Sequence, residues 1–175
     1  IRFFVLRSSD GVIRAAFDTC DVCYRARKGY RQAGDSMVCN NCGLAFRSVD
    51  INVLQGGCNP VPLDRLVESG IQNVLALRGD APTDQSAFKP VAGGFGHATE
   101  LIAFLADNWH VDIGGACYPE GHVESSSLED DLRWARVKVE KGASFLITQL
   151  FFDNKHYFDF VARLRAEGIR VPVLP

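Results

Sequence analysis

Residues 111–122, VDIGGACYPEGH, contain an apolar run that stops abruptly at a polar loop. A short apolar run bounded by turn residues is typical of a strand buried in a sheet. Similar runs occur at residues 73–77, 144–149 and 171–174. Because segments with helical spacing separate these runs, the sequence predicts a parallel sheet covered by helices. The fold class expected for this part of the chain is therefore α/β.

The segments that flank these runs show apolar residues at helical spacing. They cover residues 63–70, 97–108, 125–142 and 155–167. In the third segment, the serines at residues 125–127 precede the apolar positions and can cap the helix. Its inner face is expected to consist of Leu128, Leu132, Ala135 and Val139. This alternation of strand and helix supports the parallel sheet.

Polar residues follow the carboxyl ends of three successive predicted strands. They are Asp80 after the first strand, Tyr118, Glu120 and His122 after the second, and Gln149 and Asp153 after the third. In a parallel barrel these ends open on one face, where ligands bind. A single Asp after a strand is more often a helix cap. Because the pattern recurs at three strand ends, we expect a ligand site there.

The first 62 residues differ from the rest in composition. They hold eight Lys and Arg against five Asp and no Glu, whereas residues 63–175 hold eleven Lys and Arg against sixteen Asp and Glu. Five of the six cysteines also lie in the first part. The shift predicts one domain at residues 1–62 and another at residues 63–175, with a turn-rich stretch at their boundary. Apolar runs at residues 1–7 and 12–17, joined by a turn, predict a β-hairpin in the first domain.

The bulk properties of the chain argue against some partners. A formal net charge of −2 gives no reason to expect nucleic acid or an anionic membrane as a partner. No apolar run approaches the roughly 18 residues that a membrane-spanning helix needs. No basic segment followed by an apolar one resembles a signal peptide. We therefore expect no transmembrane segment in this chain.

Four cysteines in the first domain have metal-ligand spacing. Cys20 and Cys23 form one CxxC pair, and Cys39 and Cys42 form a second pair after a spacer of fifteen residues. Each pair places two thiolates on a tight turn, where both can bind one ion about 2.3 Å away. Structural zinc is favoured over an iron–sulfur cluster, and one or two disulfides are the alternative in an oxidising compartment. Cys58 is either a replacement ligand or a cysteine of a turn.

Residues 1–63 resemble the cysteine-rich region of a family of bacterial membrane-associated proteins. The similarity rests on FFVLRSSDGVIRAAFDTCDVCYRARKGY, MVCNNCG and GGCNPVPL. Proteins of this kind are described as iron–sulfur or metal-binding proteins and have no assigned reaction. The resemblance implies a small, mainly β metal-binding module. Its implied ligands are Cys20, Cys23, Cys39 and Cys42, with Cys58 as a candidate fifth ligand.

Residues 64–175 resemble methylenetetrahydrofolate reductases. The similarity rests on the ordered motifs GIQNVLALRGD, HATELIAFL, VDIGGACYPEGH, GASFLITQLFFDN and YFDFVARLRAEGI. The resemblance implies a (β/α)8 TIM-type barrel that binds FAD and takes a hydride from NAD(P)H. The family passes the hydride to 5,10-methylenetetrahydrofolate and so makes 5-methyltetrahydrofolate, a folate of one-carbon metabolism. It also implies a cytoplasmic location, where thiols stay reduced.

The same resemblance assigns roles to nine residues. The expected cofactor-binding residues are Arg78, Gly79, Asp80, Ala98, Tyr118, His122, Asp131 and Lys138. Two residues are expected to be catalytic: Asp80, near the isoalloxazine and the folate, and Gln149, bonded to the pterin. Lys138 would hold a phosphate of FAD. Trp134 and Val137 depart from the family pattern, in which polar or basic FAD contacts are usual at these positions.

About four of the eight barrel strands are expected in this chain, the third to the sixth by resemblance. The first strand of the family carries a glutamate that acts as general acid toward the folate, and residues 1–62 contain no Glu. A partial barrel has two open sheet edges, which favour self-association into a homo-oligomer. We therefore expect a composite or truncated chain that binds FAD weakly and reduces folate negligibly. The alternative is a non-catalytic zinc or iron–sulfur module fused to an inactive half-barrel.

Overall fold

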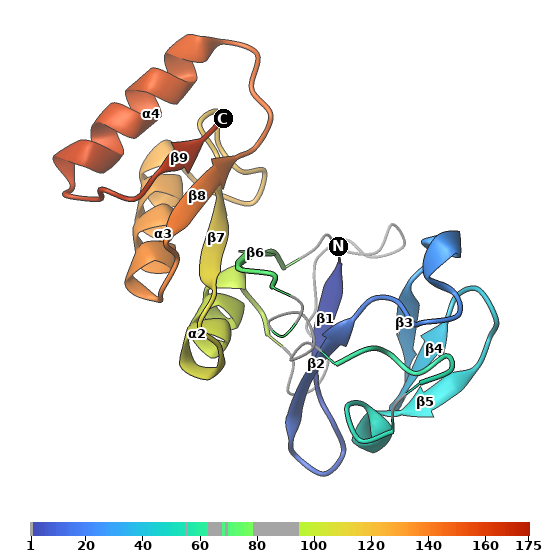
Figure 1. Ribbon diagram of the computed structural model, residues 1–175. Coiled ribbons are helices and arrows are strands. Elements are labelled where there is room, and N and C mark those ends of the chain that lie inside the picture. The colour runs from blue at the N-terminus through green and yellow to red at the C-terminus, as the bar shows by residue number, and fades with distance from the viewer. Residues whose placement is uncertain (1, 55, 63–67, 69, 79–94) are drawn as a thin grey trace. The chain divides into compact units, whose positions relative to one another are not determined.

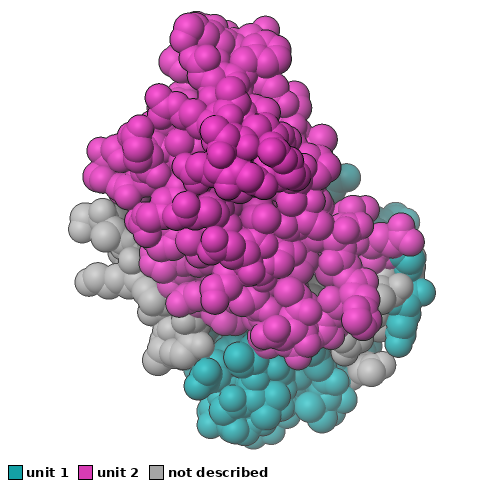
Figure 2. All heavy atoms as spheres, turned by 90° about the vertical axis from the view of Figure 1, so that its left-hand side faces the viewer, with its two compact units in different colours: residues 1–70, 90–94 teal, residues 71–89, 95–175 magenta. Residues whose placement is uncertain are grey.

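The computed structural model describes residues 2–54, 56–62, 68, 70–78 and 95–175 (Figure 1). It divides into two compact units, residues 1–70 with 90–94 and residues 71–89 with 95–175 (Figure 2). We call them unit 1 and unit 2 and describe each by itself. The domain boundary expected at residue 62 stays a prediction, and most of the helix expected at residues 63–70 lies outside the described residues.

Unit 1 begins with the β-hairpin that the sequence predicts. β1 (Phe3–Arg7) pairs antiparallel with β2 (Ile13–Phe17). The turn between them closes through a hydrogen bond of 2.9 Å from the Ser8 N–H to the Val12 carbonyl oxygen. Gly11 has a φ of +83° in this turn, a conformation that glycine adopts without steric cost.

The sequence did not predict the second sheet of unit 1, which is three-stranded and antiparallel. Its strands, in order across the sheet, are β3 (Tyr30–Ala33), β4 (Ser36–Cys39) and β5 (Ala45–Arg47). A 3-10 helix, η1 (Tyr24–Ala26), precedes the sheet and another, η2 (Ser48–Asp50), follows it. Strands of three or four residues are too short to show the apolar alternation that identifies a strand in a sequence.

A small apolar cluster forms the core of unit 1. Its buried members are Leu6, Ala16, Met37 and Ile51, and the rings of Phe4, Tyr30 and Phe46 pack against it. The Tyr30 ring lies edge-on to both of the others, with centroids 6.0 Å from Phe4 and 6.4 Å from Phe46. A core of this size is small for a unit of this length, so the unit needs a further source of stability.

Unit 2 contains the parallel sheet that the sequence predicts. Its strands, in order across the sheet, are β6 (Asn73–Ala76), β7 (Asp112–Cys117), β8 (Phe145–Thr148) and β9 (Val173–Leu174). Each expected strand is present, with bounds that differ by at most two residues from the expected ones. Because the order follows the chain, successive strands are joined by crossovers of the βαβ kind.

Three helices connect these strands. They are α2 (Ala98–Asn108), α3 (Leu128–Glu140) and α4 (Asn154–Ala166), and all three were expected. As predicted, a serine caps α3: the Ser127 hydroxyl accepts a hydrogen bond of 3.2 Å from the Asp130 N–H. Asp153 caps α4 in the same way, accepting a bond of 2.8 Å from the Lys155 N–H. Within the described ranges, no helix is both long and apolar enough to cross a membrane.

The helices cover one face of the sheet (Figure 1). The core on this face includes Leu132 and Ala135 of α3, Leu146 of β8, and Phe160 and Leu164 of α4. In β7, a Cβ added to Gly115 would lie 3.2 Å from the Lys138 Cδ. The absence of a side chain at this glycine therefore lets α3 pack closely against the sheet.

The other face of the sheet is apolar, and none of the described helices covers it. Leu77 and Leu174 on this side are 52% and 47% exposed. The register places Leu75, Gly114 and Phe145 in one row across the sheet. A Cβ on Gly114 would lie 2.5 Å from the Phe145 ring, so this glycine gives the ring its space. The adjacent glycines Gly114 and Gly115 thus serve opposite faces of the same strand.

Candidate functional site

The first cysteine pair lies on a turn that follows β2 in unit 1. The Cys23 N–H donates a hydrogen bond of 3.1 Å to the Cys20 sulfur, which closes the turn. Cys20 is buried and Cys23 is half-buried. This is the arrangement that brings two sulfurs of a CxxC motif toward one ion.

The second pair begins at the last residue of β4, Cys39, and ends with Cys42 in the turn before β5. The Gly43 N–H bonds to the Cys39 carbonyl oxygen at 2.9 Å, and the Cys39 N–H bonds to the Leu44 carbonyl oxygen at 2.9 Å. Cys39 is buried and Cys42 is exposed. A hydrogen bond from the Leu44 backbone lowers the pKa of the Cys42 thiol to about 7. Since the thiolate is the form that binds metal, this shift favours metal binding near neutral pH.

Five cysteines meet at one place in unit 1. Their sulfurs fall into two groups of three, each with its sulfurs within 4.8 Å of one another. The groups are Cys20, Cys23 and Cys58, and Cys23, Cys39 and Cys42. The structure thus brings together the four predicted ligands and adds Cys58, whose sulfur lies 3.8 Å from that of Cys23. All six cysteines of the chain are free thiols, so the disulfide alternative is not the state described here.

Neighbouring groups hold this cysteine cluster in place. The Asn41 side-chain amide donates to the Cys23 sulfur at 3.4 Å. The Tyr30 hydroxyl donates to the Cys58 carbonyl oxygen at 2.6 Å, which ties the turn of Cys58 to β3. Sulfur–sulfur separations of this size fit direct coordination, since sulfurs arranged as a tetrahedron about 2.3 Å from zinc lie roughly 4 Å apart. The cluster therefore fits a thiophilic metal ion.

At the carboxyl end of β6 in unit 2, Arg78 forms an ion pair with Glu124. Both guanidinium contacts measure 2.9 Å, one to each carboxylate oxygen. The hydrogen bond from Arg78 lowers the pKa of the Glu124 carboxyl. Sequence analysis did not identify Glu124, because nothing in the local pattern relates it to a residue 46 positions earlier. The predicted residues Gly79 and Asp80 lie outside the described residues.

The loop after β7 carries two half-buried rings. Tyr118 and His122 pack edge to face, with ring centroids 4.5 Å apart. Asp131 at the start of α3 is buried and anchors this loop, since its carboxylate accepts bonds from the His122 N–H (3.1 Å) and the Ser125 hydroxyl (2.7 Å). Both oxygens of Asp131 therefore have partners inside unit 2.

Lys138 of α3 is buried, and its side chain lies against the sheet. Its ammonium donates a hydrogen bond of 2.7 Å to the Ala116 carbonyl oxygen and lies 5.5 Å from the centre of the Tyr118 ring. Burial lowers the pKa of this amine. The structure therefore shows Lys138 stabilising the end of β7, and its expected role at an FAD phosphate stays a prediction.

The loop after β8 carries the expected amide. Gln149 is exposed, and its N–H donates to the Cys117 carbonyl oxygen at 2.8 Å. The loops after β7 and β8 are joined by a bond of 3.4 Å from the Phe152 N–H to the Glu120 carboxylate. The adjacent strand ends thus present rings, a carboxylate and an amide on one rim, as the sequence predicts for a ligand site.

The start of α2 carries Ala98 beside an aromatic pair that sequence analysis did not find. The His97 ring stacks on Trp134 of α3 with centroids 5.4 Å apart, and the Arg133 guanidinium lies 4.6 Å from the centre of the same indole. The Trp134 indole therefore packs against other side chains of unit 2. These contacts give the aromatic side chain at this position a packing role within unit 2.

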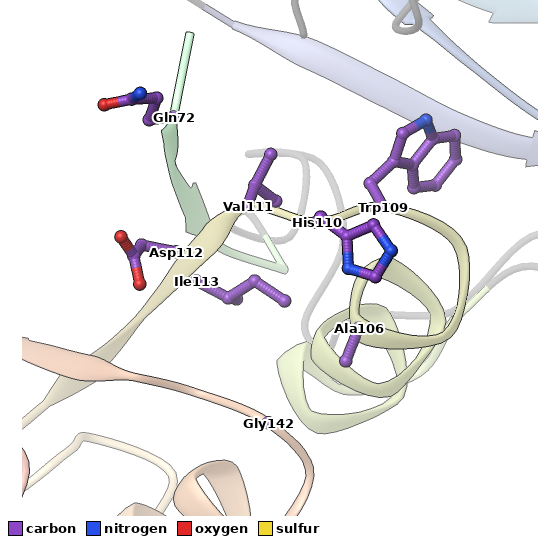
Figure 3. Close-up of a pocket in the computed structure, with 8 residues that line it drawn as sticks. All are labelled: Gln72, Ala106, Trp109, His110, Val111, Asp112, Ile113 and Gly142. Carbon is purple, nitrogen blue, oxygen red and sulfur yellow. The ribbon is translucent and has the colours of Figure 1, made fainter.

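For FAD, the exposed amide of Gln149 and the half-buried rings of Tyr118 and His122 fit a flavin site. By contrast, the polar atoms of Asp131 and Lys138 are bonded internally. A cavity of roughly 560 Å³ lies at the other end of the sheet, lined by Trp109, His110 and Asp112 among others (Figure 3). It contains none of the predicted site residues, and this end of a parallel barrel serves stability rather than catalysis.

Comparisons with known proteins match both parts of the chain. Residues 61–175 match the family model of methylenetetrahydrofolate reductase. Residues 1–76 match the model described as membrane iron-sulfur containing protein FtrD-like. Both matches agree with the resemblances drawn from the motifs.

Individual relatives support the first of these matches. Methylenetetrahydrofolate reductase 2 of Saccharomyces cerevisiae is 39% identical over 117 residues, which cover 65% of this chain and 20% of the relative. The 5,10-methylenetetrahydrofolate reductase of Pectobacterium carotovorum is 41% identical over 108 residues, which cover 62% of this chain and 34% of the relative. The chain thus spans about a fifth to a third of the length of these relatives. A solved structure, an uncharacterized protein from Clostridium thermocellum that binds two copies of 5-methyl-5,6,7,8-tetrahydrofolic acid, matches at 19% identity with a TM-score of 0.39 over 58% of this chain and 41% of that one.

Proposed function

From the premise that this chain belongs to the methylenetetrahydrofolate reductase family, we propose that unit 2 supplies part of a flavin-dependent folate-reducing site. The observation that carries the proposal is the rim formed by the loops after β6, β7 and β8, where the family motifs coincide with clustered polar side chains. When bound there, FAD would carry a hydride from NAD(P)H to 5,10-methylenetetrahydrofolate. Three plant relatives have NADH in their names.

The residues of this chain would then bind and orient the reactants. Tyr118 and His122 would line the flavin, with Ala98 nearby, and Gln149 would hydrogen-bond the pterin of a folate. Arg78, Gly79 and Asp80 would contact the cofactor after β6, and Asp80 would place a carboxylate near the isoalloxazine, where charge tunes its chemistry. Asp131 and Lys138 would act on the FAD tail only indirectly, since their polar atoms position the loop and the strand end.

The uncovered sheet face leads us to propose that the chain by itself binds FAD weakly. Leu75, Leu77 and Leu174 are exposed on that face, which in a complete (β/α)8 barrel would be enclosed. Self-association that covers the face or the sheet edges would raise flavin affinity with protein concentration. We also propose a cytoplasmic location for this protein.

A titration with FAD, followed by flavin fluorescence, tests this proposal. The variant His122→Ala removes a ring from the rim, and the control His110→Ala removes a histidine at the amino-terminal end of β7. We expect weak binding that His122→Ala reduces several-fold and His110→Ala leaves unchanged. Equal effects of the two substitutions would contradict a rim site. Stoichiometric FAD with turnover would contradict the expectation of weak binding.

A second function is favoured by the cysteine cluster. We propose that unit 1 is a metal-binding module, with zinc or an iron–sulfur centre held by Cys20, Cys23, Cys39 and Cys42, and that unit 1 works independently of flavin. An absorption spectrum with elemental analysis of freshly purified protein distinguishes the two functions. Metal without flavin would support the module alone, whereas neither metal nor sulfide would contradict it.

A further inference from the structure

The cysteine cluster of unit 1 contains one more sulfur than a four-cysteine metal site requires. Five sulfurs form two groups of three, and Cys23 belongs to both. A single ion bound by Cys20, Cys23, Cys39 and Cys42 would leave Cys58 without a role, although its sulfur lies 3.8 Å from that of Cys23. A sulfur shared between two groups is the geometry of a thiolate that bridges two metal ions.

We propose that unit 1 binds two thiophilic divalent ions, bridged by the Cys23 sulfur. One ion is held by Cys20, Cys23 and Cys58, and the other by Cys23, Cys39 and Cys42. Soft thiolates select ions of the zinc class, and a fourth position on each ion is left for water or another ligand. The inference rests on the proposed metal-binding function and deepens it.

Charge also favours two ions over one. Four thiolates around one divalent ion leave two excess negative charges, whereas five thiolates around two ions leave one. The segment between the cysteine pairs is basic, with Arg25, Arg27 and Lys28, and its backbone is tied to the second pair by a bond of 3.0 Å from the Asn40 amide to the Lys28 carbonyl oxygen. The two-ion site would therefore leave only a small negative charge in a part of the chain whose sequence is basic.

Two hydrogen bonds reach sulfurs of the proposed two-ion site, one of them the bridging sulfur. The Asn41 amide reaches the Cys23 sulfur, and the Cys23 N–H reaches the Cys20 sulfur. Donors of this kind orient ligands around a metal and stabilise thiolate charge.

The full chain, stripped of metal under reducing conditions and titrated with cadmium, tests the proposal. Thiolate-to-cadmium absorbance and native mass spectrometry measure the stoichiometry. We expect about two ions per chain, falling to about one in Cys58→Ser and in Cys42→Ser. Cys117→Ser removes the buried cysteine of unit 2 and should leave two ions bound. A stoichiometry of one that Cys58→Ser does not change would overturn the proposal while leaving metal binding intact.

A measurement on the unsubstituted chain keeps the test independent of whether a variant folds. Cadmium-113 NMR should give two resonances coupled to each other through the shared Cys23 sulfur. One resonance, or two without mutual coupling, would overturn the bridge. Iron with acid-labile sulfide in the purified protein would overturn it in favour of a cluster. Absence of any bound metal would overturn both the bridge and the metal-binding function.

Discussion

The cysteine cluster of unit 1 and the strand-end rim of unit 2 reach their geometry by different routes. The cluster is made by tight turns, so that the spacing of Cys20, Cys23, Cys39 and Cys42 already contains most of it. The rim depends on β6, β7 and β8 lying side by side. The helices that cover one face of the sheet hold these strands in place. Ligands on turns can therefore be identified from sequence alone, whereas residues at strand ends acquire their neighbours only through the sheet.

The two regions also differ in what stabilises them. Unit 1 has a small buried apolar cluster, whereas the cluster of unit 2 is about twice as large and includes the fully buried Phe160 and Leu164. We infer that unit 1 depends on its metal and unit 2 on its packing. The chain offers a convenient reporter of this difference, because both tryptophans, Trp109 and Trp134, lie in unit 2.

Metal removal should have the largest effect of all. Structural zinc sites contribute on the order of 10 kcal/mol of folding free energy in small peptides, so chelation should unfold unit 1. Hydrogen exchange of β3, β4 and β5 measures this loss of structure. The tryptophan fluorescence of unit 2 should not change, and restored metal should reverse the effect. Protection of β4 that survives complete metal removal would show that unit 1 is held by its apolar core instead.

Truncation of the unit 2 core should have the converse effect. Phe160→Ala removes a fully buried ring of α4 and should lower the free energy of unfolding of unit 2 by about 3–5 kcal/mol. Urea unfolding followed by tryptophan fluorescence measures this change. Phe158→Ala is the matched control, because Phe158 is 66% exposed on the same helix. A decrease in the metal content of Phe160→Ala would contradict the separation between the two regions.

The elements of unit 2 could be predicted because each has a local signal. The apolar runs gave β6 to β9, and the serines before Leu128 gave the start of α3. The sheet of unit 1 could not be predicted, since strands such as β5 (Ala45–Arg47) are too short to show a period. Their position is set instead by turns and by pairing with β4.

The candidate sites were predictable to different degrees for the same reason. Four ligands of the cysteine cluster follow from spacing, but the entry of Cys58 depends on how the chain returns after β5. At the rim, the family motifs pointed to Asp131 and Lys138, yet their internal bonds to the His122 backbone and the Ala116 carbonyl oxygen depend on tertiary packing. The sequence identifies which residue types lie at a site more readily than it identifies the groups to which they hydrogen-bond.

Replacement of the buried lysine should have a smaller, pH-dependent effect. Burial lowers the pKa of Lys138 in the folded chain, while the unfolded value is about 10.4. Between these values the unfolded chain binds more protons, so the free energy of unfolding of the wild type should rise with pH relative to Lys138→Met. Each unit of pKa depression corresponds to about 1.4 kcal/mol. Urea unfolding of both proteins from pH 7.5 to 10.5 measures the slope.

Lys141→Met provides the control for that experiment. Lys141 follows α3 and is exposed, so its substitution should leave the pH dependence of unit 2 unchanged. A flat difference between the wild type and Lys138→Met across the same range would show that the amine titrates alike in both states. The bond to Ala116 would then form without a desolvation cost.

The smallest effect on stability is expected at the ion pair of the rim. Glu124→Gln weakens one partner of Arg78, and because Glu124 is exposed, the unfolding midpoint of unit 2 should shift only slightly. The Arg78 hydrogen bond lowers the folded pKa of Glu124, so the stabilisation is present near neutral pH and is lost as pH falls through that pKa. Added salt should remove it as well.

The same substitution separates a structural role for this pair from a ligand-binding role. With the carboxylate gone, the Arg78 guanidinium faces less competition for a phosphate or flavin oxygen, so Glu124→Gln should bind FAD more tightly than the wild type. Glu129→Gln, which alters the exposed pair between Glu129 and Arg163 on α3 and α4, is the matched control and should not change flavin affinity. If both variants bind FAD alike, Arg78 belongs to the packing of unit 2, and the rim must find its cofactor contacts elsewhere.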